Sequence, residues 1–128
     1  MILDKRALGR AGEDAAKEYL VGQGYNILYR NFRFGRYGEI DLIAGKDGSL
    51  CFIEVKSRSG HTYGTPSEAV GYAKQKNILA VANHYLRVVD HSGQKLRFDV
   101  VEVYCEKTGG DSHINIIEIR HIENAFGS

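Results

Sequence analysis

The sequence predicts an α/β fold in which helices flank a mixed β-sheet of about five strands. Apolar residues recur at helical spacing or alternate along the chain in the order helix, three strands, helix, two strands. Short turns separate the first three strands, which favours antiparallel pairing. The second helix lies between two strands, which is typical of a crossover joining parallel neighbours. A sheet with both kinds of connection is mixed.

The N-terminal half is expected to hold one helix and three strands. Gly24 is a natural end for the helix, because glycine readily adopts the left-handed conformation that closes helices. A tight turn at Gly35 and Arg36 joins the first two strands, and the sequence KDGS joins the second to the third. These elements are the helix 5–23 and the strands 25–34, 37–45 and 50–58.

The second helix has a well-marked beginning in the sequence TPSE. Thr65 would cap it, Pro66 occupies the first helical position, and Glu68 closes a capping box. The helix is expected to continue to about Arg87. Two further strands are expected at 95–105 and 113–122, the first of them parallel to 50–58.

Size and composition indicate one ordinary globular domain, residues 1–128. The chain is 43% hydrophobic and 26% charged, and its net charge of +1 argues against an indiscriminate binder of polyanions. No apolar run approaches the roughly 18 residues of a membrane span. Cys51 and Cys105 lack paired spacing, so a zinc site or disulfide framework is not expected and a cytoplasmic location is favoured.

Charged residues interrupt two neighbouring strands of the predicted sheet. Side chains alternate along a strand, so Phe52, Glu54 and Lys56 share one face. Antiparallel pairing through the short KDGS turn would bring Asp41 close to Glu54 and Lys56. Glu39 shares a strand face with Asp41, and its role is left open between solvation and metal binding.

Two like charges in a partly buried sheet cost several kcal/mol unless a cation compensates them. Mg²⁺, or Mn²⁺, suits such a site because it accepts one or two carboxylates and completes its shell with waters. A bound metal lowers the pKa of water and stabilises charge on a phosphate. Lys56 would then position or deprotonate the attacking water. The alternatives are a surface ion pair for Glu54 and Lys56 and a solvated carboxylate for Asp41.

This set of residues resembles the core of the PD-(D/E)xK nucleases, the restriction-endonuclease-like superfamily. Asp41 matches the first acidic residue, and Glu54-Val55-Lys56 matches the (D/E)xK motif 13 residues later. More narrowly, the chain resembles the YraN family of uncharacterised bacterial proteins, which is similar to Holliday-junction resolvases. The matching segments are GRAGEDAAKEYL, GYNILYRNFR, GEIDLIA, FIEVKSR, EAVGYAKQK and RFDVVEV.

The resemblance implies a restriction-endonuclease-like fold and further site residues. It implies that Glu13, in the segment GRAGE, joins Asp41 and Glu54 as a metal ligand, and that Gln75 lies near the scissile phosphate. Lys74 and Lys76, which flank Gln75, would contact nucleic acid. Glu13 could instead be one polar residue of an amphipathic helix, and Gln75 an ordinary surface residue. The chain departs from the superfamily at Ile40, where many members have proline.

Arginines and aromatic residues alternate in LYRNFRFGRYG, which contains no acid. Arg30, Arg33 and Arg36 suit phosphates, and the aromatic side chains suit bases that leave a duplex. An edge hairpin protected by charge has the same composition. Arg58, just after the proposed site, is a further candidate for nucleic-acid binding. Asp99 interrupts another strand and is expected to be structural, paired with Arg97 or with a helix terminus.

The sequence therefore predicts a divalent-metal-dependent endonuclease that acts on DNA of branched or otherwise unusual structure. The resolvase resemblance implies a homodimer, since cutting two strands of a junction needs two active sites. Two alternatives remain open. One is a non-catalytic nucleic-acid-binding module that keeps the fold, and the other is a scaffold whose acidic cluster is structural.

Overall fold

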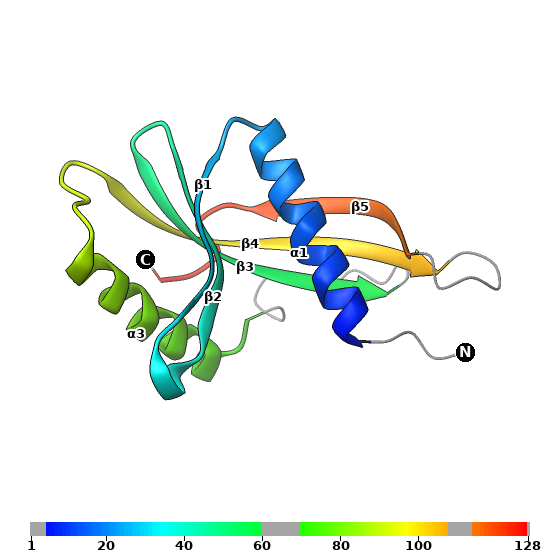
Figure 1. The fold of residues 1–128 in the computed structure, drawn as a ribbon, viewed down its shortest axis with the longest axis horizontal. Coiled ribbons are helices and arrows are strands. Elements are labelled where there is room, and N and C mark those ends of the chain that lie inside the picture. Colours follow the sequence, from blue (N-terminus) through cyan, green and yellow to red (C-terminus); the bar gives the residue numbers. More distant parts are fainter. Residues whose placement is uncertain (1–4, 60–69, 108–113, 128) are drawn as a thin grey trace.

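The computed structural model describes residues 5–59, 70–107 and 114–127. A five-stranded sheet is flanked by two helices, as the sequence predicts (Figure 1). The elements are α1 (Lys5–Gly22), β1 (Asn26–Arg33), the one-turn 3₁₀ helix η1 (Gly35–Tyr37), β2 (Glu39–Lys46), β3 (Ser49–Ser59), α3 (Tyr72–Val88), β4 (Lys95–Lys107) and β5 (Ile114–Ile122). Neither described helix is long and apolar enough to cross a membrane.

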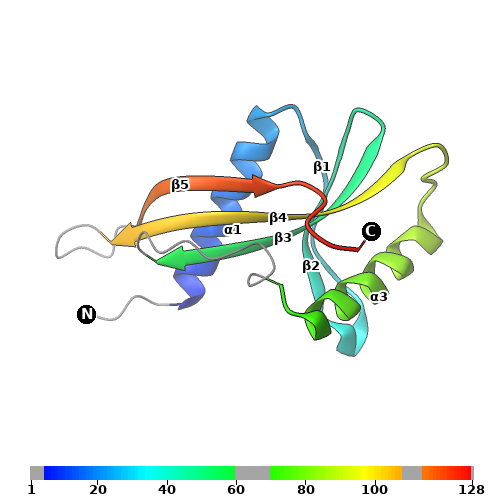
Figure 2. The same ribbon diagram turned by 180° about the vertical axis from the view of Figure 1, so that it is seen from behind.

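The strands lie in the order β1-β2-β3-β4-β5. Only β3 and β4 pair in parallel, across the connection that contains α3, and the other three pairs are antiparallel. This confirms the predicted mixed sheet and its parallel neighbours. The sheet is strongly twisted, so that β1 and β2 run across the direction of β4 and β5 (Figures 1 and 2).

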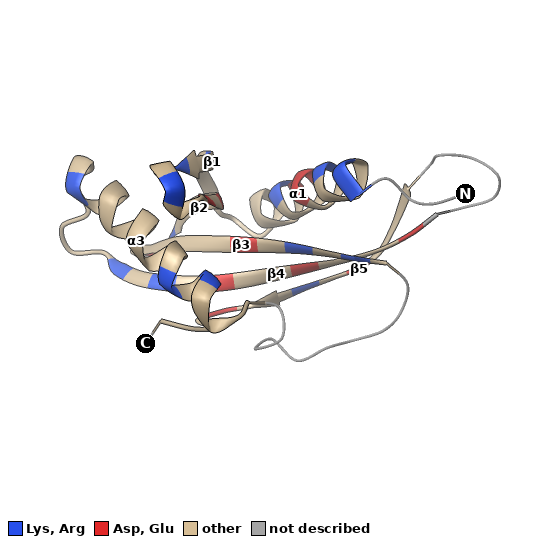
Figure 3. Cartoon of the chain, turned by 90° about the horizontal axis from the view of Figure 1, so that it is seen from below, with Lys and Arg blue, Asp and Glu red and all other residues tan. Residues whose placement is uncertain are grey.

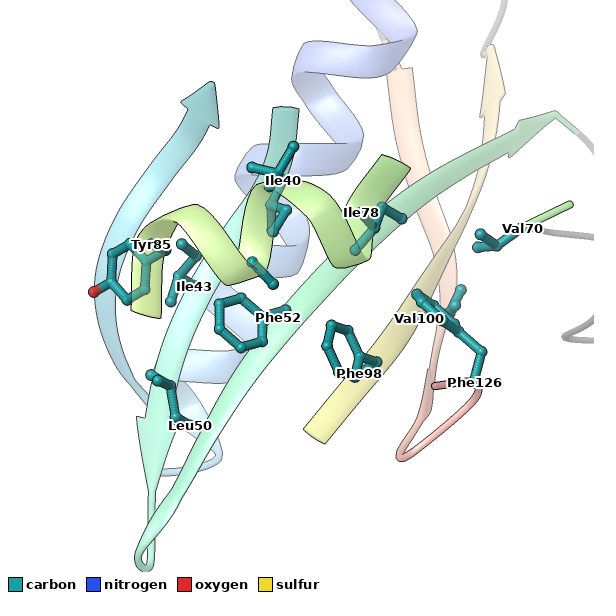
Figure 4. Packing of buried hydrophobic residues seen from close by; sticks show 12 residues of the cluster. Ile40, Ile43, Leu50, Phe52, Val70, Ile78, Tyr85, Phe98, Val100 and Phe126 are labelled. Carbon is teal, nitrogen blue, oxygen red and sulfur yellow. The ribbon is translucent and has the colours of Figure 1, made fainter. Parts of the chain in front are cut away.

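Two hydrophobic clusters, one on each face of the sheet, hold the layers together. Under α3, Phe52 and Phe98 stack at 5.3 Å between ring centroids and meet Ile78 and Tyr85 of the helix (Figure 4). On the other face, fully buried Leu20 and other residues of α1 pack on β2, β3 and β4. Both central strands are therefore buried on both faces, which explains their long apolar runs.

Helix α3 begins at Tyr72, and the described residues just before it are not helical. Residues 65–68, with the expected capping box, lie outside the described residues. The predicted uninterrupted helix is wrong at Val70 and Gly71, which are not helical, and α3 starts at Tyr72. Gly71 is extended and precedes the first turn, while the Val70 side chain is almost fully buried in the cluster under α3. Burying Val70 there requires a break in the chain direction that local helix propensity does not encode.

A buried ionic network joins β4 to β5. The Asp99 carboxylate is fully buried and accepts hydrogen bonds from Arg97 Nε at 3.0 Å and from the Asn124 backbone N–H at 2.9 Å. His121 Nε2 lies 2.7 Å from the same carboxylate. The predicted structural pairing of Asp99 with Arg97 is confirmed. Burial alone would raise the pKa of Asp99, but His121 and Arg97 outweigh it and the pKa is lowered.

We expect Asp99→Asn to lower the free energy of unfolding by about 3 kcal/mol, because it removes the buried charge that pairs with both Arg97 and His121 and leaves Arg97 only its ion pair with Glu123. Urea denaturation followed by circular dichroism measures this. Asp47→Asn is the matched control, since Asp47 is exposed in a turn at φ 50°, a conformation that asparagine accepts. Equal stability of the two variants would contradict a structural role for Asp99.

Candidate functional site

The candidate site forms where β2 separates from β3. Their backbone pairing ends at Leu42 and Ile53, although β2 begins three residues earlier and β3 continues to Ser59. Beyond this fork, the Asp41 carboxylate accepts a hydrogen bond from the Val55 backbone N–H at 2.8 Å. The side chain thus replaces the missing strand as the partner of Val55, and it is held between the two strands.

The strand alternation is interrupted at the fork. Ile40 and Ile43 both pack in the cluster under α3, although they are three residues apart, while Leu42 packs in the cluster under α1. A regular strand would place Ile40 and Ile43 on opposite faces. The irregularity turns β2 away from β3 and opens the space that Asp41 occupies.

Glu54 meets Asp41 from β3. Its side chain is nearly buried, and its carboxylate lies 3.1 Å from Lys74 Nζ in the first turn of α3. Phe52 and Glu54 both face α3 while Ile53 faces α1, as the predicted alternation requires. Figure 3 shows neighbouring acidic and basic positions on β3 and the basic first turns of α3.

The Asp41 carboxyl is strongly perturbed by its surroundings. Burial, together with the Glu54 carboxyl in hydrogen-bond contact, raises the pKa of Asp41 to about 9. Burial acts to lower the pKa of Lys74, but attraction to Glu54 outweighs it and the pKa is raised. The Lys74 ammonium therefore pairs with Glu54, and Asp41 keeps a proton up to about pH 9. A divalent cation would neutralise both carboxylates without that proton.

These groups border a hollow of about 700 Å³. Its lining includes Asp41, Glu54, Lys56 and Lys74, and also Glu13 of α1. The hollow collects residues from four separate elements, α1, β2, β3 and α3, and its volume lies in the range of ligand-binding clefts. Lys56 is exposed at its border, with its Cα paired opposite Glu102 of β4.

Glu13 reaches the hollow because α1 lies very close to β3. A Cβ on the neighbouring residue, Gly12, would overlap the hydroxyl of Ser57, so glycine is needed for this approach. Burial raises the pKa of Glu13, against the opposing effect of Arg30, whose Nη2 lies 3.7 Å from its carboxylate. Within residues 5–59, 70–107 and 114–127, no three acidic, histidine or cysteine side chains are grouped to hold one metal. The described donors are therefore the Asp41–Glu54 pair, with Glu13 nearby.

Other predicted site residues lie elsewhere. Gln75 is not among the residues that line the hollow, and its side-chain amide donates to the Val70 carbonyl oxygen at 2.9 Å. This bond fixes the chain just before α3. Lys76 lies over the ring of Tyr72, at 5.3 Å from its centroid.

The arginines proposed for nucleic-acid binding fall into two groups. Three are paired with acids: Arg30 with Asp14 at 2.7 Å, Arg33 with Glu39 at 3.8 Å, and Arg58 with Glu102 at 2.8 Å. Arg36 instead lies over the ring of Tyr37, at 5.6 Å from its centroid. The pair at Arg33 also gives Glu39 a partner away from Asp41.

Sequence reasoning missed two features of this region. Lys74 was expected to contact nucleic acid, yet it forms an ion pair inside the site. Glu102 was not singled out, although it is fully buried and accepts hydrogen bonds from Arg58 and from the Tyr104 hydroxyl. Glu102 interrupts the apolar run DVVEVY as Glu54 interrupts its own strand. An acid inside an apolar strand is therefore the sequence feature that could have identified Glu102 as a buried, paired residue.

The pKa of Asp41 predicts a pH dependence of stability in the absence of metal. Between about pH 4 and pH 9 the folded protein holds a proton that the unfolded chain has released. The free energy of unfolding should therefore fall as pH rises, by up to about 1.4 kcal/mol per pH unit. Asp41→Asn should remove this slope, measured by urea denaturation in EDTA at several pH values. Asp47→Asn should keep it, and an unchanged slope in Asp41→Asn would show that Asp41 titrates normally.

Comparison with known sequences gives a consistent assignment. The model of Uncharacterised protein family UPF0102 matches residues 12–103. A UPF0102 protein of Acetivibrio thermocellus is 50% identical over 123 residues, covering 96% of this chain and 93% of the relative. The UPF0102 protein STH1475 of Symbiobacterium thermophilum is 49% identical, with 94% and 97% covered. One from Rhodococcus opacus is 43% identical, with 94% and 96% covered. These matches agree with the YraN-like resemblance and extend over all elements of the site.

Proposed function

This chain belongs to uncharacterised protein family UPF0102, and we propose that it is a divalent-metal-dependent endonuclease that hydrolyses phosphodiester bonds in DNA. The observation that carries the proposal is the contact between the Asp41 and Glu54 carboxyls at the border of the hollow, where burial together with this contact raises the pKa of Asp41 to about 9. A fold that needed these residues only for stability would gain by replacing one acid with a neutral side chain. The presence of both the Asp41 and the Glu54 carboxyl is explained if a cation binds between them.

The donor set suits Mg²⁺ or Mn²⁺. Both donors are carboxylates, and a hard cation of this kind accepts two of them with waters in its remaining positions. When bound, the ion supplies a water of lowered pKa and neutralises charge on the phosphate. Asp41 would be held in place as a ligand by the Val55 N–H, and Glu54 by its position on β3.

The lysines divide the remaining work. Lys56, exposed at the border of the hollow, would orient the attacking water or take its proton. Lys74, now paired with Glu54, would be released toward the phosphate when a cation takes over its partner. Glu13 lines the hollow and would hold a water of the metal, while Gln75 would act indirectly by fixing the start of α3.

The expected substrate is DNA of branched or otherwise unusual structure, and the expected assembly is a homodimer, since two strands of a junction need two active sites. Two free, buried cysteines support a cytoplasmic location. A second candidate is a non-catalytic nucleic-acid-binding module. It is favoured by the Lys74–Glu54 ion pair, which partly satisfies the acidic pair without any metal.

We expect the protein to bind Mn²⁺ and Asp41→Asn or Glu54→Gln to weaken this binding at least about tenfold, because each removes one of two anionic ligands. Isothermal titration calorimetry measures the affinity. Binding should strengthen as pH rises, because the metal displaces the proton on Asp41. Glu39→Gln, on the same strand but paired with Arg33, is the control and should bind normally. Equal effects of Glu39→Gln and Glu54→Gln would contradict the site.

Incubation with Mg²⁺ should cleave a labelled four-way junction or flap, and Lys56→Ala should slow the reaction by on the order of 10²-fold or more. Single-turnover rates on denaturing gels measure this. Lys17→Ala, on the exposed part of α1, should react as the wild type does. Binding of these DNAs that is unchanged in Asp41→Asn, Glu54→Gln and Lys56→Ala, with no cleavage of any substrate, would favour the non-catalytic module.

A further inference from the structure

A second hollow, away from the carboxylate site, lies between the β1–β2 hairpin and α3. Its volume is about 330 Å³, at the small end of ligand pockets. Phe34 and Tyr37 line it from the hairpin end, and Ala80, Asn83, His84 and Arg87 line it from one face of α3. The sequence pattern points only to the hairpin, and the structure adds one face of α3 to the same surface.

Aromatic rings form a column along this hollow. His84 lies between two phenylalanines, at 4.0 Å from Phe34 with an angle of 3° between planes, and at 6.0 Å from Phe32 with 26°. Tyr37 stacks on Phe34 at 5.6 Å and 22°. The four rings are nearly parallel and end at Tyr37, over which Arg36 lies. A parallel stack of rings that ends near solvent offers a flat surface to another flat ring.

Polar groups beside the column suit a nucleotide. Within the described residues, no acid pairs with Arg36 or Arg87, in contrast to the acid-paired Arg30 and Arg58. The Asn83 amide is exposed on the lining and offers both a donor and an acceptor, as the edge of a base requires. Aromatic faces together with unpaired arginines are the combination that binds single-stranded nucleic acid.

The position of the hollow connects it with the carboxylate site. Lys74 and Asn83 belong to the same helix, nine residues apart, which corresponds to about 14 Å along its axis. That distance is about four steps of a DNA strand at 3.4 Å each. Nine residues are two and a half turns, so the two side chains leave opposite sides of α3, and a strand that reaches both places has to bend around the helix.

We infer that this hollow binds a nucleobase that has left its duplex, which takes the place of Arg36 over the Tyr37 ring and stacks there, with its phosphates on the displaced Arg36 and on Arg87. This inference rests on the proposed function and narrows the substrate to nucleic acid with at least one unpaired base near the cut. Inside an intact duplex both faces of each base are covered by neighbours and only the end pairs expose one face, so blunt duplex should use the hollow far less than a single strand does.

The test measures binding in EDTA, so that no hydrolysis is needed. Fluorescence anisotropy compares a short labelled oligodeoxythymidine, the same backbone with abasic sites, and a blunt duplex. The wild type should prefer the base-bearing single strand. Tyr37→Ala should weaken that binding on the order of tenfold, and Tyr37→Phe should restore it because the ring remains. Abasic backbone should bind equally weakly to wild type and Tyr37→Ala.

A second variant guards against a folding defect in Tyr37→Ala. Arg87 is exposed, and Arg87→Gln should weaken binding and reduce the slope of log affinity against log salt by about one. Lys17→Gln, the same loss of charge on exposed α1, should change neither binding nor slope beyond a general charge effect. Each variant is compared only if its melting temperature equals that of the wild type, which shows that it is folded.

The inference is overturned if abasic and base-bearing strands bind equally, or if folded Tyr37→Ala and Arg87→Gln both bind like the wild type. Failure of the wild type to bind any single strand also overturns it. None of these results depends on metal binding or cleavage, which test the proposed function separately. If the wild type fails to bind Mn²⁺, the endonuclease proposal is contradicted. The proposed base-stacking surface is then still tested by these DNA-binding measurements alone.

Discussion

The hydrogen bond from the Val55 N–H to the Asp41 carboxylate is the interaction on which the site depends. It forms where β2 and β3 stop pairing, and it occupies a backbone donor that would otherwise lack a partner on that side. By holding Asp41 at the fork, it brings that carboxyl against Glu54. The acidic lining of the hollow and the raised pKa of Asp41 both depend on this placement.

Of the two carboxyls at the centre of the site, only Glu54 is paired with a cationic side chain of the described residues. Glu54 pairs with the Lys74 ammonium, and Asp41 keeps a proton. By contrast, the buried Asp99 is fully matched by Arg97 and His121, and its pKa is lowered. Asp99 is thus held as a paired, ionised carboxylate, whereas Asp41 holds a proton that a bound cation would displace.

The alternation of side chains along strands predicted the pair of carboxyls at the centre of the site. It placed Phe52 and Glu54 on one face, and the short turn after β2 brought Asp41 to Glu54, both of which the structure confirms. The prediction did not contain the fork, because the break in alternation between Ile40 and Ile43 comes from packing under α3, not from local sequence. Nor did it contain the Lys74–Glu54 pair, which depends on where α3 begins. The break just before α3 was not predicted because the burial of Val70 outweighs helix propensity.

The most direct test of the central claim is a crystal soaked in Mn²⁺ and measured for anomalous scattering. The account predicts a peak bonded to carboxylate oxygens of both Asp41 and Glu54, at about 2.0–2.2 Å, with Lys74 displaced from Glu54. A peak elsewhere, or no peak while Lys74 still pairs with Glu54, would contradict it.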